Sequence, residues 1–449
     1  MIMKEKHMFS DRDLRKLLIP LMLEQLLTSL MGMVDTMMVS NVGSAAISAV
    51  SLVDAINILV IQALAALAGG ATILCSQYIG SGSRERAENA AGQVVLSVTA
   101  ISVAMTAICV GLRVPMLNLI FGEVEAEVMR NSQVYFLLTA LSFPFIALYN
   151  CGAAVFRAQK NTKTPMAVSV TSNCLNVAGN AVLIYGMQMG VAGAALATLV
   201  SRIFSAAVVM YLLRNPQLEL TVREYHKIRP DWDCIKRVLG IGVPSGVENS
   251  MFQLGKLAIQ STVSLLGTTA IAAQAMTNTL EYLNTVGCVG VGMGMMTVVG
   301  QCIGAKREDE AVYYIKKLTI WSEVVMIVSC VAVYAIAGPV TVLGGMEAES
   351  AKMCMQMTLA ITIFKPLIWV PSFVPVYGMR AAGDVKFAMV ISCLSMWIFR
   401  VSLAWILCRY TGIGPMGVWI AMFVDWTARG FVFGHRFRSR KWLRHKVIE

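Results

Sequence analysis

Twelve long apolar segments run along this sequence, and they constrain its fold more than any other feature. Short polar stretches separate the segments, which cover approximately residues 17–39, 50–79, 90–112, 131–156, 166–186, 190–213, 238–266, 271–303, 315–337, 353–379, 387–408 and 413–434. A helix needs about 20 apolar residues to cross about 30 Å of hydrocarbon. Because backbone groups in lipid must hydrogen-bond within their own segment, we expect every span to be a helix. The sequence therefore predicts an all-α polytopic membrane protein with 12 transmembrane helices.

Composition excludes the other broad classes of protein. Apolar residues make up 57% of the 449 residues and charged residues only 14%, whereas soluble domains carry about 25% charged residues. A soluble globular protein, a disordered chain, a collagen and a coiled coil are all excluded. The first segment is not a cleaved signal peptide, because it contains Pro20, Glu24 and Asp35 and no small-residue cleavage site follows it.

The distribution of basic residues predicts the orientation in the membrane. If the N-terminus is cytoplasmic, 28 of the 37 Lys and Arg residues fall in inside segments and only four in outside loops. The positive-inside rule then places both termini in the cytoplasm. We expect the basic tail after residue 434 to face lipid headgroups. A nucleic-acid-binding arm is the alternative for that tail, and we expect no nucleic-acid partner.

An internal repeat predicts the architecture. A shift of 224 residues aligns landmark residues of the two halves of the chain, among them Pro20 with Pro244, Glu24 with Glu248, Gly70 with Gly294, and Gly190 with Gly414. Each half then holds six spans, and an even number makes the two lobes parallel and pseudo-symmetric. The expected domains are an N-terminal lobe at 1–213, a cytoplasmic connector at 214–237, a C-terminal lobe at 238–434 and a basic cytoplasmic tail at 435–449.

An ordered set of short motifs lies on this repeat. It comprises Val-Asp-Thr-Met-Met at 34–38, Gln-x-Ile-Gly at 77–80 and 301–304, Phe-Arg-Ala at 156–158, Lys-Thr-Pro at 163–165, and Gly-Val-Ala-Gly-Ala-Ala-Leu-Ala-Thr at 190–198. With the length and the span count, this set resembles the multidrug and toxic compound extrusion (MATE) transporters over essentially the whole chain.

The resemblance implies a function. It implies a secondary active antiporter of a bacterial inner membrane that exports small amphiphilic compounds by alternating access, cationic ones above all, in exchange for H⁺ or Na⁺. No cofactor is expected beyond the coupling ion, and the partners expected are a small-molecule substrate and the lipid bilayer around a monomer. A flippase for a lipid-linked sugar or another anionic lipid-like substrate is the alternative, because Lys256, Lys365 and Arg400 lie within spans.

A polar group in the first lobe is the candidate coupling site. Asn176 and Asn180 are four residues apart and share one helix face, and they lie at a similar depth to Asp35 and Thr198. A carboxylate with amide and hydroxyl oxygens suits a hard cation such as Na⁺, and a buried carboxyl group also suits a proton. By resemblance, Asp35, Asn176 and Thr198 match the family's first-lobe site. Many relatives carry Asp where this chain has Asn180, which weakens the Na⁺ interpretation.

Several first-lobe residues carry two interpretations. The asparagines either ligate the ion or only join neighbouring helices. Tyr149, in the fourth span, is a weaker candidate for a substrate contact. Pro20 removes a helix hydrogen bond fifteen residues before Asp35, so it marks either a charge-responsive kink or a static bend. Pro244 repeats it in the second lobe.

The second lobe has a different set of charges. Many relatives carry a Glu eight residues after the seventh-span proline, and Phe252 occupies that place here. Glu281, Lys256 and Arg400 are predicted at one depth and therefore in one network, with Lys365 also within a span. This network is either a charge-paired helix clamp or a second substrate or proton-linked site.

The repeat also aligns two acids, one in each half of the chain. Glu24 and Glu248 lie in the inner halves of their spans and either line an inward-facing vestibule or make local polar contacts.

The sequence has no motif for ATP hydrolysis or catalysis. The chain has no phosphate-binding G-x-x-x-x-G-K-[ST] loop. It also has no metal-ligand set and no nucleophile with a base at membrane depth. We therefore expect no enzyme, no catalytic residue and no metal site.

Overall fold

Helices make up the structure. The computed structural model describes residues 7–122, 124–223, 225, 228–445 and 447–448, and these residues form helices and no strand. The first half holds α1 (Asp11–Ser40), α2 (Ser44–Gly80), α3 (Arg84–Gly111), α4 (Arg113–Phe121), α5 (Ala126–Leu141), α6 (Phe143–Ala158), α7 (Lys163–Asn180), the π-helix η1 (Ala181–Gly186) and α8 (Gly190–Leu212). The second half holds α9 (Trp232–Ser264), α10 (Thr268–Gly304), α11 (Glu308–Leu343), α12 (Ala348–Ala381), α13 (Val385–Ser395), the π-helix η3 (Met396–Ser402), α14 (Leu403–Tyr410), α15 (Met416–Arg438) and the 3₁₀-helix η4 (Lys441–Arg444). The all-α membrane fold is confirmed.

The helices match the twelve apolar segments, some of them as composites. Eleven helical segments among the described residues are long and apolar enough to cross a membrane, and three of these join consecutive helices: α5 with α6, α7 with η1, and α13 with η3 and α14. The twelfth, α9, is 33 residues long. Glu248, Gln253 and Lys256 interrupt its apolar character, so composition alone does not mark it as a span. The count of 12 is consistent with these helices. The short helix α4 lies outside the expected segments.

Contacts divide the chain into two compact units. The N-half unit is Leu27–Gly246, and the C-half unit combines the chain up to Leu26 with the chain from Val247 onward. Both boundaries fall within helices, α1 and α9, and not at the polar connector. Each unit therefore contains part of the first helix of the other sequence repeat. The lobe bounds expected from the sequence, 1–213 and 238–434, stay a prediction.

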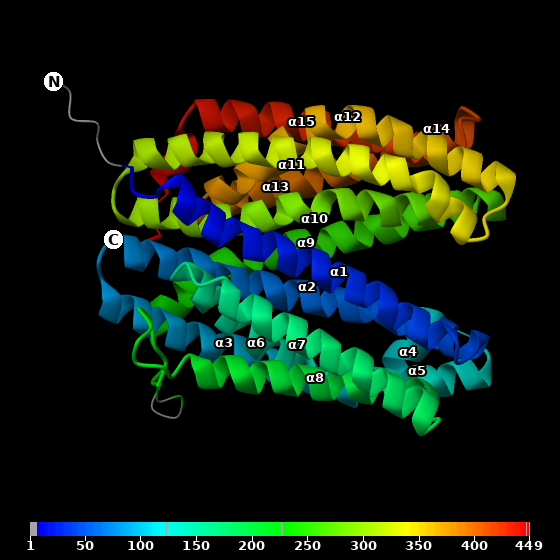
Figure 1. The fold of residues 1–449 in the computed structure, drawn as a ribbon, viewed down its shortest axis with the longest axis horizontal. Coiled ribbons are helices and arrows are strands. Elements are labelled where there is room, and N and C mark those ends of the chain that lie inside the picture. The colour runs from blue at the N-terminus through cyan, green and yellow to red at the C-terminus, as the bar shows by residue number, and fades with distance from the viewer. Residues whose placement is uncertain (1–6, 123, 224, 226–227, 446, 449) are drawn as a thin grey trace. The chain divides into compact units, whose positions relative to one another are not determined.

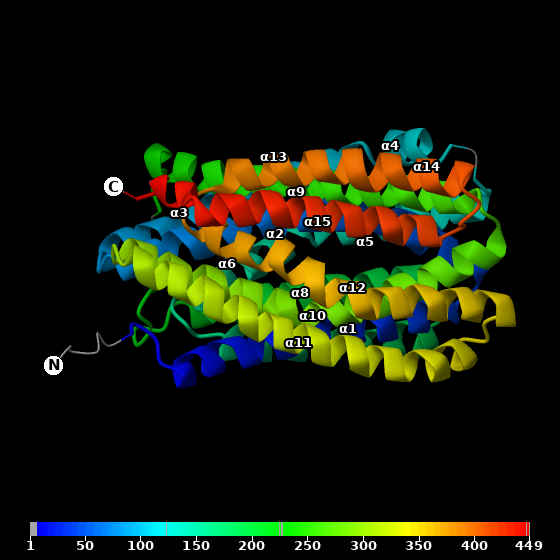
Figure 2. The ribbon, with the colours of Figure 1, turned by 90° about the horizontal axis from the view of Figure 1, so that it is seen from above.

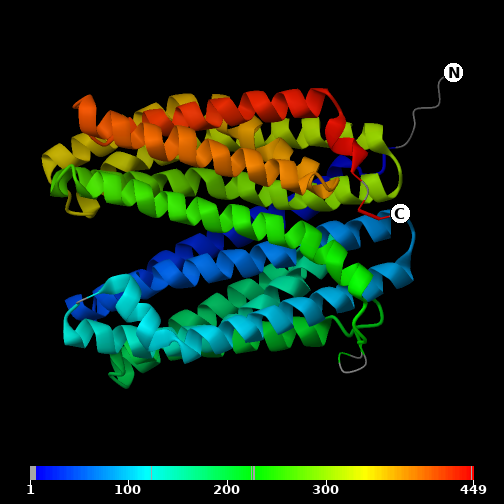
Figure 3. The same cartoon turned by 180° about the vertical axis from the view of Figure 1, so that it is seen from behind.

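In the N-half unit, α2 and α8 are the central helices. Helix α2 packs on α3, α5 and α6, and α8 packs on α5, α6 and α7; these blue to green helices run along similar directions in Figure 3. The connector is docked on α3, where Gln93 Nε2 donates to the carbonyl oxygen of Arg229 at 2.7 Å. Asp231 directly precedes α9. Its carboxylate accepts hydrogen bonds from the backbone N–H of Cys234 and from the side-chain amide of Asn89, and these bonds lower its pKa.

In the C-half unit, α10, α11 and α12 pack against one another and α12 packs on α15; Figures 1 and 2 show these helices side by side from two directions. Leu14, Leu17 and Leu18 of α1 join the largest apolar core of this unit. Two backbone contacts fix the start of α1 there: Phe9 N–H donates to Tyr314 Oη at 2.8 Å, and Met8 N–H donates to Glu310 at 2.9 Å.

Repeat-matched glycines allow the close helix crossings in both units. A Cβ on Gly294 of α10 would lie 2.3 Å from Leu18 of α1, and a Cβ on Gly70 of α2 would lie 3.3 Å from the backbone of Gly242 of α9. Leu18 and Gly242 are also 224 residues apart. Small residues let helix backbones approach closely within a membrane. The same crossing is therefore built twice, once in each unit.

One apolar residue anchors the basic tail. Trp442 is fully buried and stacks on Phe437 with ring centroids 5.7 Å apart. Arg436 Nε donates to Asp384 at 2.8 Å. Trp442 thus joins the apolar core of the C-half unit, whereas Lys441 and Arg444 are exposed, and contact of these charges with lipid headgroups stays a prediction. Lys446 and Glu449 lie outside the described residues.

The α2–α9 crossing leads to a test with an internal control. A Cβ on Gly242 would lie 2.9 Å from Leu67 Cα, whereas a Cβ on Gly240 meets nothing within 4 Å. We expect Gly242→Ala to lower stability by about 1–3 kcal/mol through overpacking. Gly240→Ala should raise stability by about 0.5–1 kcal/mol through helix propensity. Nine of the 11 cysteines are buried, so thermal unfolding in detergent followed with a thiol-reactive fluorophore measures both changes. Equal midpoints for the two variants would contradict this packing.

Candidate functional site

Asp35 of α1 lies in a polar cage made by α7 and α8 within the N-half unit. Asn180 Nδ2 donates a hydrogen bond to Asp35 Oδ1. Asn176 lies between Asp35 and Thr198: with its amide nitrogen toward the carboxylate, it donates to Asp35 Oδ1 at 3.1 Å and accepts the Thr198 backbone N–H at 3.2 Å. The structure thus brings together all four residues predicted for the coupling site.

Small residues create the space for this cage. A Cβ on Gly179 would lie 3.0 Å from the Ala197 side chain, and a Cβ on Gly193 would lie 3.1 Å from the backbone of Leu183. Helices α7 and α8 therefore approach closely enough for Asn176 to reach Thr198. The π-helix η1 starts directly after Asn180, and such local departures from the α-helix are frequent at functional sites.

One oxygen of the cage has no protein partner. Asn180 is fully buried, and its Oδ1 accepts no hydrogen bond from any described residue. A buried amide oxygen without a donor is costly, and such an oxygen is a suitable ligand for a hard cation. The cage therefore offers one carboxylate and at least one free oxygen, with two amide groups as donors to the carboxylate.

A second acid beside this cage was missed. Asp54 of α2 is half-buried and accepts hydrogen bonds from Asn57 at 3.1 Å and from Tyr135 Oη at 3.2 Å. Arg202 of α8 lies close enough for its charge to act on both Asp35 and Asp54. Arg202 follows Thr198 by four residues on α8 and therefore shares its helix face. This spacing is the sequence signal that could have identified Arg202 as part of the site.

Tyr149 makes its contact away from this cage. Its hydroxyl donates to the carbonyl oxygen of Pro165 at 3.1 Å, and the side chain is buried. This contact joins α6 to the start of α7. Pro20 and Pro244 lie within α1 and α9, as expected.

The predicted charge network of the C-half unit has different pairings. Lys365 of α12 is fully buried and bonds the Glu281 carboxylate, the Glu281 carbonyl oxygen at 3.0 Å and Thr285 Oγ1 at 2.6 Å. Lys256 has no ion-pair partner within the described part of the chain, although Glu281 and Arg400 lie close enough for their charges to act on it. Glu281, Lys256 and Arg400 therefore lie near one another, but residue depth alone did not identify Lys365 as the direct ion-pair partner of Glu281.

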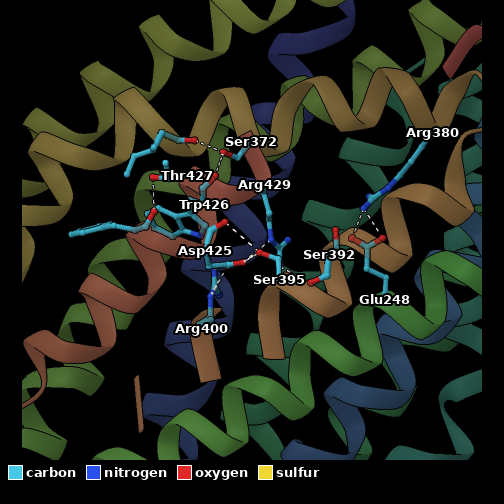
Figure 4. A network of polar contacts seen from close by, with 12 residues as sticks. Glu248, Ser372, Arg380, Ser392, Ser395, Arg400, Asp425, Trp426, Thr427 and Arg429 are labelled. Carbon is cyan, nitrogen blue, oxygen red and sulfur yellow. Dashed lines mark hydrogen bonds and ion pairs between the residues drawn. The ribbon is translucent and has the colours of Figure 1, made fainter. Parts of the chain in front are cut away.

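Arg400 pairs with an acid that sequence reasoning missed. Asp425 of α15 is fully buried and lies between two arginines (Figure 4): Arg400 Nη2 is 2.9 Å from Oδ2, and Arg429 Nε is 2.9 Å from Oδ1. Ser395 also donates to Asp425 Oδ1. Asp425 and Arg429 are four residues apart in one apolar segment, which is the signal that was available.

The repeat-matched acids have buried positions. Glu248 accepts two hydrogen bonds from Arg380 Nη2, at 2.6 and 2.7 Å, and is 8% exposed, as Figure 4 also shows. Glu24 is 5% exposed. Glu248 thus makes a local polar contact, which is one of the two interpretations given for it above; the other was the lining of an inward-facing vestibule. The described residues contain no group of three His, Cys, Asp or Glu side chains that could hold a metal ion.

Comparison with known proteins gives a family and a shared fold. The MatE family model matches the chain twice, at residues 20–182 and 244–406, which reproduces the offset of 224 residues. The "Uncharacterized transporter YisQ" of Bacillus subtilis is 27% identical, covering 94% of this chain and 93% of its own length. The "Probable multidrug resistance protein NorM" of Thermotoga maritima is 26% identical, with coverages of 97% and 94%. An "outward-facing conformation of a multidrug resistance MATE family transporter" superimposes with a TM-score of 0.85 at 20% identity over 97% of both chains.

Asp425, Arg400 and Arg429 form a buried triad, and removing its one carboxylate should greatly lower the stability of the protein. Asp425→Asn would leave Arg400 and Arg429 buried without a carboxylate, and breaking a buried pair from one side costs about 3–5 kcal/mol. We expect a clearly lower unfolding midpoint in the thiol-reactive assay and a lower yield of folded protein. Glu349→Gln, which removes an exposed carboxylate at the start of α12, is the matched control and should change neither. An unchanged midpoint for Asp425→Asn would refute the triad.

Proposed function

The chain belongs to the MatE family of membrane transporters and is not an enzyme; from this premise we propose that it is a secondary active antiporter that exports small amphiphilic compounds in exchange for H⁺ or Na⁺. The names of the bacterial relatives support multidrug export. Cationic amphiphiles are the first substrates to test, because Asp35 and Asp54 outnumber Arg202 in the polar network of the N-half unit.

One observation carries the coupling proposal: Asp35 is a half-buried carboxylate inside a cage of amide and hydroxyl groups. A carboxylate in such a place changes its charge when a proton or a cation arrives. The ion and the substrate then favour different conformations, which is the requirement for antiport. Asn176, Asn180 and Thr198 hold the carboxylate and supply the oxygens.

The membrane supplies enough energy for this exchange. One charge moving down the membrane potential releases about 2.3 kcal/mol per 100 mV, and an ion gradient adds to that. Pro20 removes a backbone hydrogen bond from α1 fifteen residues before Asp35, so the helix can bend there. We propose that the angle of this bend changes when Asp35 gains or loses its charge. Pro244 would serve α9 in the same way.

The distribution of basic residues supports an orientation with both termini in the cytoplasm. The bacterial relatives support a bacterial inner membrane, and we propose that the protein is a monomer there. The second-half residues Glu281 and Lys365 form a clamp between α10 and α12 in this proposal, and Glu24, Glu248 and Tyr149 hold helices together. A flippase for a lipid-linked sugar is the second candidate, which the surplus of cations around Asp425 favours.

The first experiment is efflux of ethidium from vesicles under an imposed pH gradient and, separately, under a Na⁺ gradient. Wild type should respond to one of them, which names the ion. Asp35→Asn should respond to neither, because an amide cannot change its charge. Glu349→Gln should behave as wild type. Equal responses of wild type and Asp35→Asn would remove Asp35 from coupling, and no dye movement by wild type would direct the next assay to lipid-linked sugars.

Asn180 offers a second test, of ion choice. Asn180→Asp places a second carboxylate against Asp35, and two carboxylates bind a hard cation more tightly than one. We expect Na⁺-driven efflux to rise by about tenfold relative to wild type at a fixed gradient. Asn180→Ala, which removes the oxygen without adding charge, is the control and should not gain Na⁺ dependence. A gain in Asn180→Ala, or none in Asn180→Asp, would contradict a role for this position in ion choice.

A further inference from the structure

Lys256 is an exposed lysine inside a membrane-spanning helix. It lies eight residues before the end of α9 at Ser264, about two helical turns from that end. A lysine at this depth that faced hydrocarbon would cost at least about 2.5 kcal/mol. Intramembrane cations therefore face a water-filled cavity or a partner, and the described residues offer Lys256 no ion pair. Its ammonium group is thus available to a ligand.

Phe252, one turn before Lys256, is surrounded by cations. The Lys256 ammonium lies 5.2 Å from the centre of the Phe252 ring, the Arg400 guanidinium 5.0 Å and the Arg429 guanidinium 5.9 Å. An aromatic face attracts cations and tolerates their desolvation. Three positive side chains therefore gather around one apolar ring, and the ring lies half-buried between them.

Close packing holds these groups in place. Gly255 lies against Met396 of η3, where an added Cβ would come within 2.3 Å of the methionine side chain. This contact brings the π-helix that carries Arg400 against α9. Arg400 and Arg429 are each 2% exposed, so the two guanidinium groups are held in the interior of the unit, and of the three cations only Lys256 is exposed.

The charges of this cluster do not balance. Asp425 is the one carboxylate bonded to Arg400 and Arg429 among the described residues, so the three cations around Phe252 exceed the acid by two. Glu281 is already bonded to Lys365. The indole N–H of Trp426, whose ring lies 5.8 Å from Arg400, also has no acceptor among the described residues. Positive charge and an unused donor both favour an anion.

We propose that Lys256, Phe252 and Arg400 form a binding site for the anionic group of an amphiphilic substrate, a carboxylate. Lys256 makes the direct ion pair, Arg400 and Arg429 supply the fixed positive field behind it, and Phe252 contacts the apolar body. The site is distinct from the Asp35 cage. It rests on the proposed export of small amphiphiles and extends their class from cations to zwitterions and organic anions.

Two rhodamine dyes differ by the group in question. Rhodamine 110 carries a free carboxylate, and rhodamine 123 is its methyl ester. Binding of each dye to the purified full-length protein in detergent is measured by fluorescence anisotropy. We expect Lys256→Met to weaken rhodamine 110 binding by about tenfold or more and to leave rhodamine 123 within about twofold.

Two control variants and one competition experiment make the result decisive. Lys352→Met removes an exposed lysine of the same unit and should change neither dye. Lys256→Arg keeps the charge and should retain rhodamine 110 binding within about threefold. Equal effects of Lys256→Met on both dyes, or none on either, would overturn the proposal, and so would displacement of rhodamine 110 from wild type by pyrophosphate but not by benzoate.

This measurement is independent of ion coupling. Binding in detergent involves no gradient, so a failure of Asp35→Asn to alter efflux would leave the rhodamine result intact. Conversely, wild type that transports ethidium under a gradient and binds both rhodamines equally well with and without Lys256 would keep the antiporter and remove the anion site.

Discussion

The cost of an unpaired charge inside a membrane is the constraint on which the rest of this structure depends. Where the chain carries an acid and a base inside its spans, most of them meet: Lys365 with Glu281, and Arg400 and Arg429 with Asp425. The Lys365–Glu281 pair joins α12 to α10 and the Arg400–Asp425 pair joins η3 to α15, so these two pairs also hold the bundle together, whereas Arg429 and Asp425 lie on one helix. Asp35 and Lys256 have no ion-pair partner within the described part of the chain, so they are among the informative groups.

Much of the fold could be predicted from the sequence, because a bilayer imposes a length and a hydrogen-bonding rule on each span. The Asp35 cage was also predictable, since the spacing of Asn176 and Asn180 is a property of one helix and the depth of Thr198 follows from its distance to a helix end. Both kinds of inference use local geometry. Neither requires knowledge of which helices are neighbours.

What the sequence left open was which helices are neighbours. Depth placed Glu281, Lys256 and Arg400 near one another, but the direct ion-pair partners are Lys365 and Asp425, which come from other helices. Asp54 was not among the candidate residues, yet it accepts a hydrogen bond from Tyr135 of α5. The basic charge of the tail was no sign that Trp442 is buried. Rotation about a helix axis decides such contacts, and an apolar segment carries too weak a periodicity to reveal that rotation.

The repeat makes this chain symmetric in backbone and asymmetric in charge. Gly70 and Gly294 allow the same close helix crossing, one in each unit, so the two halves share this packing of their helices. Their polar groups differ in sign: Asp35 and Asp54 exceed Arg202 in one unit, whereas three cations exceed Asp425 around Phe252 in the other. Packing constrains the glycines because a Cβ there would collide with a neighbouring helix. In the proposed function, the charge of the ligand constrains the polar positions instead, so each half can change the sign of its polar group while the helix crossing stays the same.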